Sequence, residues 1–119
     1  MILMDTSVWV AHFRKADPAL AALLDSRLAG THPFVIGELA CGNLKERRRT
    51  LADLALLAAG PVTIENEVLH LLEAHNLFGK GLGWVDLHLL ASAKLAGWWL
   101  WTLDAALAAA AAKLRVSAG

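Results

Sequence analysis

Short apolar runs alternate with helical segments along this chain, and that alternation constrains the fold more than any other feature. We predict strands at residues 1–4, 32–34, 62–64 and 98–103, with a last short strand at residues 115–116. We predict helices at residues 7–15, 18–29, 35–41, 45–59, 65–78, 84–96 and 105–114. Strands that alternate with helices usually form a parallel sheet with helices packed on both faces. The sequence therefore predicts an α/β fold: one domain over residues 1–119, with a parallel sheet of four to five strands sandwiched between helices.

The composition indicates what kind of partner and which cellular location to expect for this chain. Hydrophobic residues make up 57% of the 119 residues and charged residues 18%, so we expect part of the surface to be buried against a partner. The most apolar stretch, residues 95–112, contains Asp104 and follows Lys94, so we interpret it as a strand and a helix rather than a membrane span. The chain starts without a basic leader, and Cys41 is its only cysteine, so we expect a cytoplasmic protein. The formal net charge is zero, which provides no general attraction to nucleic acid.

Four acidic residues stand at positions that a parallel sheet can bring together. Asp5 follows the first predicted strand and Asp104 follows the strand at residues 98–103. Glu38 and Asp86 each interrupt an apolar segment near a helix that can open at the same edge. Ligands of such sheets bind beyond the carboxyl ends of the strands. We therefore predict that these four carboxylates meet at one edge of the sheet.

Each acid also has a structural explanation. Asp5 and Asp104 stand where a helix N-cap is favoured, and Asp86 suits the first turn of a helix. Glu38 is harder to explain, because burying an unpaired carboxylate among apolar residues is costly. No lysine or arginine neighbours Glu38 or Asp86, so a cluster of these acids would need a divalent cation. Carboxylate ligands in an incomplete cage suit Mg²⁺ or Mn²⁺, whereas one cysteine and scattered histidines do not suit zinc.

Four short motifs contain these acids, in order along the chain. Residues 4–9 (MDTSVW) contain Asp5, and residues 37–39 (GEL), followed by Gly42, contain Glu38. Residues 81–91 (GLGWVDLHLLA) contain Asp86, and residues 101–104 (WTLD) contain Asp104. Through these motifs the chain resembles the PIN-domain nucleases, and among them the VapC-type toxins of bacterial toxin–antitoxin pairs.

This resemblance implies a site and an activity. It implies a Mg²⁺- or Mn²⁺-dependent endoribonuclease that hydrolyses RNA with a metal-activated water. Asp5 and Asp86 are then the direct metal ligands, and Glu38 and Asp104 complete the site directly or through water. The hydroxyls expected to support the metal or the phosphate are those of Thr6, Ser7 and Thr102. Ala106 stands where some family members carry a further acid, so the number of metals stays open.

The resemblance also implies partners: an RNA substrate, a VapB-type antitoxin and a second copy of the chain in a homodimer. Candidate RNA contacts are Lys80, Arg47 and Arg48, although a basic helix face is more often simply solvated. The tryptophans at 98, 99 and 101 are expected in the core, and Trp9 or Trp84 at an interface. The alternative function is a non-catalytic module that keeps the PIN fold and acts only through protein or RNA partners.

Overall fold

The computed structural model describes residues 1–118, and a parallel β-sheet lies at its centre. The strands are β1 (Ile2–Met4), β2 (Ala29–Thr31), β3 (Ala58–Ala59) and β4 (Trp99–Trp101). Their order in the sheet is β3-β2-β1-β4, and every neighbouring pair is parallel. The predicted α/β fold with a parallel four-stranded sheet is therefore confirmed.

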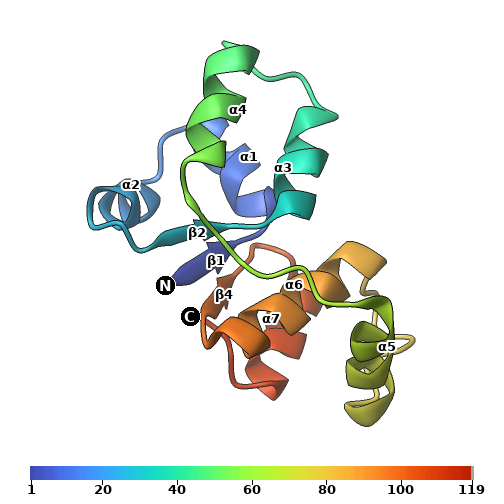
Figure 1. Ribbon diagram of the computed structural model, residues 1–119. Helices are drawn as coiled ribbons and strands as arrows, with labels where there is room; N and C mark the ends of the chain where they lie inside the picture. The colour runs from blue at the N-terminus through green and yellow to red at the C-terminus, as the bar shows by residue number, and fades with distance from the viewer. Residues whose placement is uncertain (119) are drawn as a thin grey trace.

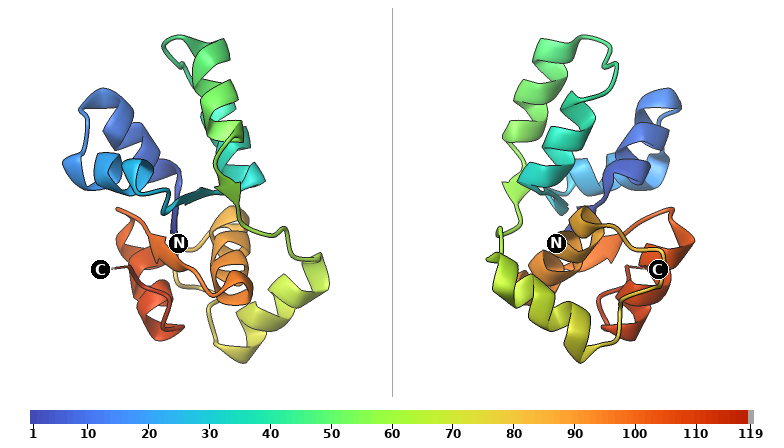
Figure 2. Two further views of the ribbon diagram at one scale, coloured as in Figure 1. Left: turned by 60° about the vertical axis from the view of Figure 1, so that its left-hand side comes forward. Right: turned by 90° about the vertical axis from the view of Figure 1, so that its right-hand side faces the viewer.

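Seven helices in the described residues cover the two sides of this sheet. They are α1 (Thr6–Arg14), α2 (Pro18–Asp25), α3 (Pro33–Ala40), α4 (Arg47–Ala55), α5 (Glu65–Ala74), α6 (Trp84–Ala96) and α7 (Ala105–Lys113). Figures 1 and 2 show α1 to α4 together on one side of the sheet and α5 to α7 on the other. No helix in the described part of the chain is both long and apolar enough to cross a membrane.

Local sequence signals explain where several helices begin and end. Asp5 caps α1 by accepting a hydrogen bond from the Val8 N–H, and Asp104 caps α7 in the same way. Asp17 caps α2, with proline at its first position, as the sequence predicts. Helix α6 occupies the predicted residues and ends at Gly97, whose φ of +69° favours glycine. The predicted caps are therefore present, and two of them are also candidate site residues.

The core forms where β1 and β4 meet the helices on both faces. Leu3 and Met4 of β1 are fully buried, and Leu100 of β4 is 2% exposed. Leu89 and Leu90 of α6 are also buried and belong to the same apolar cluster. This packing fixes the strand ends that carry Asp5 and Asp104.

The second and third strands do not lie where the sequence predicted them. Residues 32–34 form no strand, because His32 caps α3 through its Nδ1 and Pro33 begins the helix. Strand β2 instead occupies residues 29–31, where the sequence had predicted the end of a helix that in fact stops at Asp25. Strand β3 likewise occupies residues 58–59 rather than 62–64, because the helix predicted over 45–59 stops at Ala55. These short strands lack the apolar alternation that identifies longer ones.

The tryptophans of the strand predicted at residues 98–103 were expected in the core, and this prediction is wrong in part. Strand β4 is at the end of the strand order, and the strand predicted at 115–116 is reduced to a single bridge between Leu100 and Ser117. The side chain of Trp99 is 52% exposed, whereas Trp9, a predicted interface residue, is 2% exposed. Alternation along a strand turns Trp99 away from the core that holds Leu100.

Candidate active site

Two of the four acids follow neighbouring parallel strands. Asp5 comes directly after β1, and Asp104 comes three residues after the end of β4. The Asp5 N–H donates to the Trp101 carbonyl oxygen over 3.1 Å, which continues the pairing of the two strands to their ends. Glu38 and Asp86 are contributed by α3 and α6, on opposite sides of the sheet. The carboxyl edge of the sheet is therefore where the four motifs converge.

Asp5 is held firmly by three hydrogen-bond donors. Its Oδ1 accepts from the Ser7 hydroxyl over 2.5 Å and from the Val8 N–H over 3.2 Å. Its Oδ2 accepts from the Thr102 hydroxyl, which lies 97 residues away in the sequence. The residue is only 6% exposed, so these donors replace the water that the carboxylate loses. Asp5 is thus a preorganised, ionisable group at the bottom of the site.

Glu38 differs from the expectation that it is buried among apolar residues. Its side chain is exposed, and its Oε1 accepts a hydrogen bond from the Thr6 hydroxyl over 2.6 Å. The apolar neighbours Val35 and Leu39 point into the core instead, because they lie on another face of α3. Because Thr6 directly follows Asp5 in the sequence, this hydrogen bond links Glu38 to the segment that carries Asp5.

Asp86 is the acid whose chemistry the fold alters. Its Oδ2 accepts a hydrogen bond from the Gly83 N–H over 2.9 Å, a capping contact at the start of α6. The pKa of Asp86 is nevertheless raised above its ordinary value, mainly because burial removes water from the carboxylate. Repulsion by Asp104, Asp5 and Glu38 raises this pKa further, and the Gly83 N–H partly opposes the rise. The charges of the other three predicted acids therefore reach Asp86, so the four acids form one electrostatic site.

Asp104 combines a cap with a link to the same cluster. Its Oδ1 accepts from the Leu107 N–H over 2.9 Å, and its own N–H donates to the Thr102 hydroxyl over 3.0 Å. Thr102 therefore joins Asp104 to Asp5. Asp104 can cap α7 and still belong to the acid cluster, because only its Oδ1 makes the capping contact and its second carboxylate oxygen takes no part in it.

The four carboxylates are ligands of the type that suits a hard divalent cation. The single ion pair within residues 1–118 joins Arg49 to Asp53 on α4, so no cation of the protein balances the four acids. The described residues contain no ready group of three or more acidic, histidine or cysteine side chains that would hold a metal unaided. An incomplete set of carboxylate oxygens is what Mg²⁺ and Mn²⁺ use, because these ions keep several waters and add substrate oxygens. A cation here would also relieve the repulsion that Asp86 experiences.

Within residues 1–118 the predicted hydroxyls donate hydrogen bonds to these acids, whereas the predicted RNA contacts do not. Thr6, Ser7 and Thr102 each donate to one of the acids. Lys80 is exposed in the loop before α6, and Arg48 is exposed on α4. The Arg47 guanidinium donates to the carbonyl oxygens of Ala40 and Gly42, over 2.5 and 3.1 Å, at the end of α3. Arg47 therefore has a structural role that the sequence did not indicate.

Two backbone contributions to the site were missed at the level of sequence. The Gly83 N–H holds Asp86, and the Leu103 N–H donates to the Ser7 hydroxyl over 3.0 Å. The first could have been recognised from the spacing of Gly83 and Asp86, which is that of a helix cap and its third residue. The second joins residues 96 positions apart, and no local pattern predicts it.

Comparison with known proteins places this chain in a family. Residues 2–113 match the sequence model of the PIN domain. Two relatives named Ribonuclease VapC32, from Mycobacterium tuberculosis strains CDC 1551 / Oshkosh and ATCC 25618 / H37Rv, are each 49% identical over 118 residues, covering 98% of this chain and 95% of the relative. The crystal structure of PAE2754 from Pyrobaculum aerophilum has the same fold, with a TM-score of 0.68 and 18% identity over 98% of this chain and 86% of that chain.

The chain therefore belongs to the PIN-domain family. Within it, the two relatives confirm the predicted resemblance to the VapC-type ribonucleases of toxin–antitoxin systems.

Proposed function

We propose that this chain is the toxin of a toxin–antitoxin pair and cuts RNA as a Mg²⁺- or Mn²⁺-dependent endoribonuclease. One observation carries the proposal: four carboxylates converge at the carboxyl edge of the sheet, where burial, together with repulsion by the other three, raises the pKa of Asp86. The relatives named Ribonuclease VapC32 support the same activity. The site residues and the identity of the metal are part of the proposal.

We assign different roles to the four acids according to how deeply each is buried. Asp5 and Asp86 are partly or fully buried and are the proposed direct ligands, whereas the exposed Glu38 and Asp104 complete the site directly or through water. A divalent ion bound there would activate water and neutralise charge that develops on the phosphate. The hydroxyls of Ser7 and Thr102 orient Asp5, and that of Thr6 orients Glu38, so the acids are aligned before substrate binds.

The proposed reaction is hydrolysis of a phosphodiester bond. Water adds to phosphorus and loses one proton while the bond to the 3′ oxygen breaks and that oxygen takes up one proton from solvent, so the products end in a 5′-phosphate and a 3′-hydroxyl. Glu38 is exposed to solvent, and we assign its carboxylate to accept the proton of the attacking water. No 2′-hydroxyl takes part, which distinguishes this chemistry from transesterification.

The partners follow from the family and from the surface. We propose a VapB-type antitoxin, a homodimer and a cytoplasmic location. Several large apolar side chains are exposed and would be covered by protein partners, among them Leu56 at 85% and Ile64 at 65% exposure. Lys80 and Arg48 remain the candidate contacts to RNA phosphates.

The test uses acid-to-amide variants, which keep size and remove charge. Asp5→Asn and Asp86→Asn should each abolish metal-stimulated cleavage of RNA while the protein stays folded by circular dichroism. The matched control is Asp17→Asn, which alters a helix cap on α2 away from the site and should cleave normally. Sequencing of the RNA ends should show 5′-phosphates.

Two outcomes would contradict the proposal. Cleavage by both folded site variants at the wild-type rate would remove the acids from the reaction. A wild-type protein that gives no heat on titration with Mg²⁺ or Mn²⁺ and cuts no RNA would instead be a binding module.

A further inference from the structure

One cavity is lined in part by α3 and α6, the helices that carry Glu38 and Asp86, and is not explained by cleavage. It has a volume of about 580 Å³ and lies between the start of α6, the start of α3 and the segment that leads into α5. The residues that line it are Phe34, Val62, Thr63, Ile64, Glu65, Asn66, Trp84 and His88. This volume falls in the range of roughly 300–1,000 Å³ typical of small-ligand sites.

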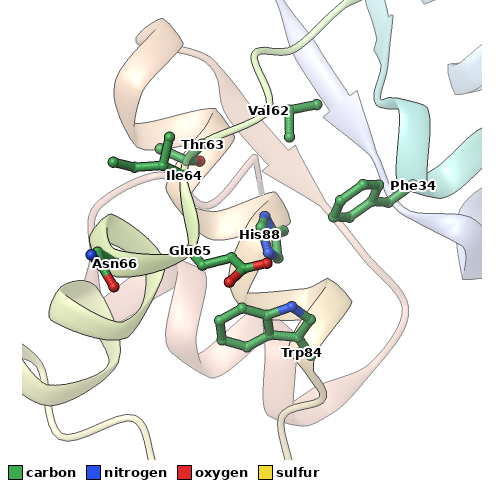
Figure 3. A pocket seen from close by; sticks show the side chains of 8 residues that line it. All are labelled: Phe34, Val62, Thr63, Ile64, Glu65, Asn66, Trp84 and His88. Carbon is green, nitrogen blue, oxygen red and sulfur yellow. The ribbon is translucent and has the colours of Figure 1, made fainter.

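Three rings form the aromatic part of this cavity (Figure 3). The His88 ring packs edge-on against Trp84, with centroids 4.9 Å apart, and against Phe34, with centroids 4.8 Å apart. Trp84 is 43% exposed, so its ring offers area to a ligand as well as to His88. Planar rings at the mouth of a cavity provide surfaces on which an unstacked nucleobase can pack.

Two of the residues that line this cavity also carry buried polar atoms without partners. The Nδ1 of His88 and the Oγ1 of Thr63 are buried and have no hydrogen-bond partner, and these residues are only 2% and 8% exposed. A buried polar atom that lacks a partner costs free energy, so such atoms usually await a ligand or a water. The Glu65 carboxylate points toward the rings and places a negative charge beside them (Figure 3).

The charge of Glu65 decides which part of RNA fits here. A phosphate would be repelled by this carboxylate, whereas the N–H groups of a base can donate to it. Guanine carries two adjacent N–H donors on its Watson–Crick edge, and they match the two oxygens of one carboxylate. Uracil presents one N–H between two carbonyl oxygens, which the carboxylate repels.

The position of the cavity relative to the acids fits a substrate subsite. Trp84 and Asp86 both lie in the first turn of α6, where their side chains leave the helix on different faces, so the start of this helix carries one residue of the cavity and one acid. Phe34 and Glu38 lie four residues apart on α3 and so share one side of that helix. A single strand of RNA whose phosphate lies at the acids can therefore place a neighbouring base in the cavity.

From these observations we infer that the cavity lined by Trp84, Phe34, His88 and Glu65 is a nucleobase subsite that selects an unpaired guanine next to the cleaved phosphodiester. This inference rests on the proposed ribonuclease function and adds a source of sequence preference to it.

The test measures RNA binding in EDTA, so that cleavage does not enter the result. The probes are short uridine oligonucleotides that carry one central guanosine, inosine or uridine, with tryptophan fluorescence and anisotropy as readouts. The wild-type protein should bind the guanosine probe most tightly. Inosine lacks the exocyclic amine and should bind about tenfold or more weakly.

Two pairs of variants locate the effect in the cavity. Trp84→Ala should weaken binding of the guanosine probe by about 5- to 150-fold, the range expected for loss of one stacked base. Trp99→Ala removes a tryptophan of 52% exposure from β4, outside the cavity, and should bind normally. Glu65→Gln should remove the preference for guanosine over inosine, whereas Glu67→Gln, on the same turn of α5, should keep it.

The outcomes separate this inference from the proposed function. Equal binding of the three probes, or equal loss in Trp84→Ala and Trp99→Ala, would overturn the subsite. A Trp84→Ala variant that changes the sedimentation coefficient of the protein but not its RNA binding would show that the cavity is a contact between two copies of the chain, and would overturn it as well. Guanosine-selective binding by a protein that cuts no RNA would leave the subsite in place and refute the nuclease.

Discussion

The hydroxyl of Thr102 offers the sharpest quantitative test of how the site is held together. It donates to Asp5 Oδ2 and accepts from the Asp104 N–H, so one oxygen connects two of the four acids. Valine has nearly the same shape but no hydroxyl. In Thr102→Val the carboxylate of Asp5, which is 6% exposed, loses a donor that water cannot readily replace.

The magnitude follows from the type of contact that is lost. A hydrogen bond to a charged group contributes about 1.5–3 kcal/mol, and the exposed Asp104 N–H can turn to water at little cost. We therefore expect Thr102→Val to lower the free energy of unfolding by about 1.5–3 kcal/mol. Thr102→Ser keeps the hydroxyl and loses one methyl group, so its loss should stay near 1 kcal/mol.

The same variant should affect the proposed metal site. Groups that orient a metal ligand typically change affinity or activity by about 10- to 100-fold when they are removed. We expect Mn²⁺ affinity, measured by calorimetry, to fall by that factor in Thr102→Val and to be retained in Thr102→Ser. Urea denaturation at pH 7.5 gives the stability of all three proteins. If valine and serine behave alike in both measurements, the hydroxyl does not hold Asp5 and the reasoning is refuted.

Two further predictions concern the packing beneath the site and its response to pH. A Cβ at Gly30 would lie 2.6 Å from Cζ3 of Trp98, so Gly30→Ala should lower the free energy of unfolding by about 1–3 kcal/mol; a denaturation midpoint equal to wild type would contradict that packing. Burial lowers the pKa of the His32 side chain below its ordinary 6.5. As the pH falls, the unfolded chain therefore binds a proton at this position before the folded protein does, so the free energy of unfolding should decrease below about pH 6.5. His32→Asn keeps a cap acceptor for α3 and should reduce this slope between pH 7.5 and 5; an unchanged slope would exclude His32 as its source.

Local sequence was sufficient for the fold class and for the caps. The alternation of apolar runs and helical segments predicted a parallel sheet, and aspartate followed by proline or alanine predicted the starts of α2 and α7 correctly. The first and last major strands were also found, because β1 and β4 are runs of large apolar residues. These features depend on neighbours in the chain, which a sequence displays directly.

Local sequence failed for the two short strands β2 and β3. Strand β2 consists of Ala29, Gly30 and Thr31, and β3 has only two alanines, so neither carries an apolar pattern. Strand β2 forms because it pairs with β1, and β3 forms because it pairs with β2; both pairings are contacts between distant segments. Pairing, rather than intrinsic propensity, also decides that Trp99 faces outward.

The four acids show the same division between sequence and tertiary structure. The sequence by itself determined which acids to examine and that they lack a basic neighbour, because those facts are matters of identity and spacing. Only the tertiary structure decided that Thr102 reaches Asp5 across 97 residues, that Glu38 is exposed, and that Asp86 is the acid whose pKa rises. Burial and repulsion depend on distances through space, and the chain sets those distances only when strands and helices pack together.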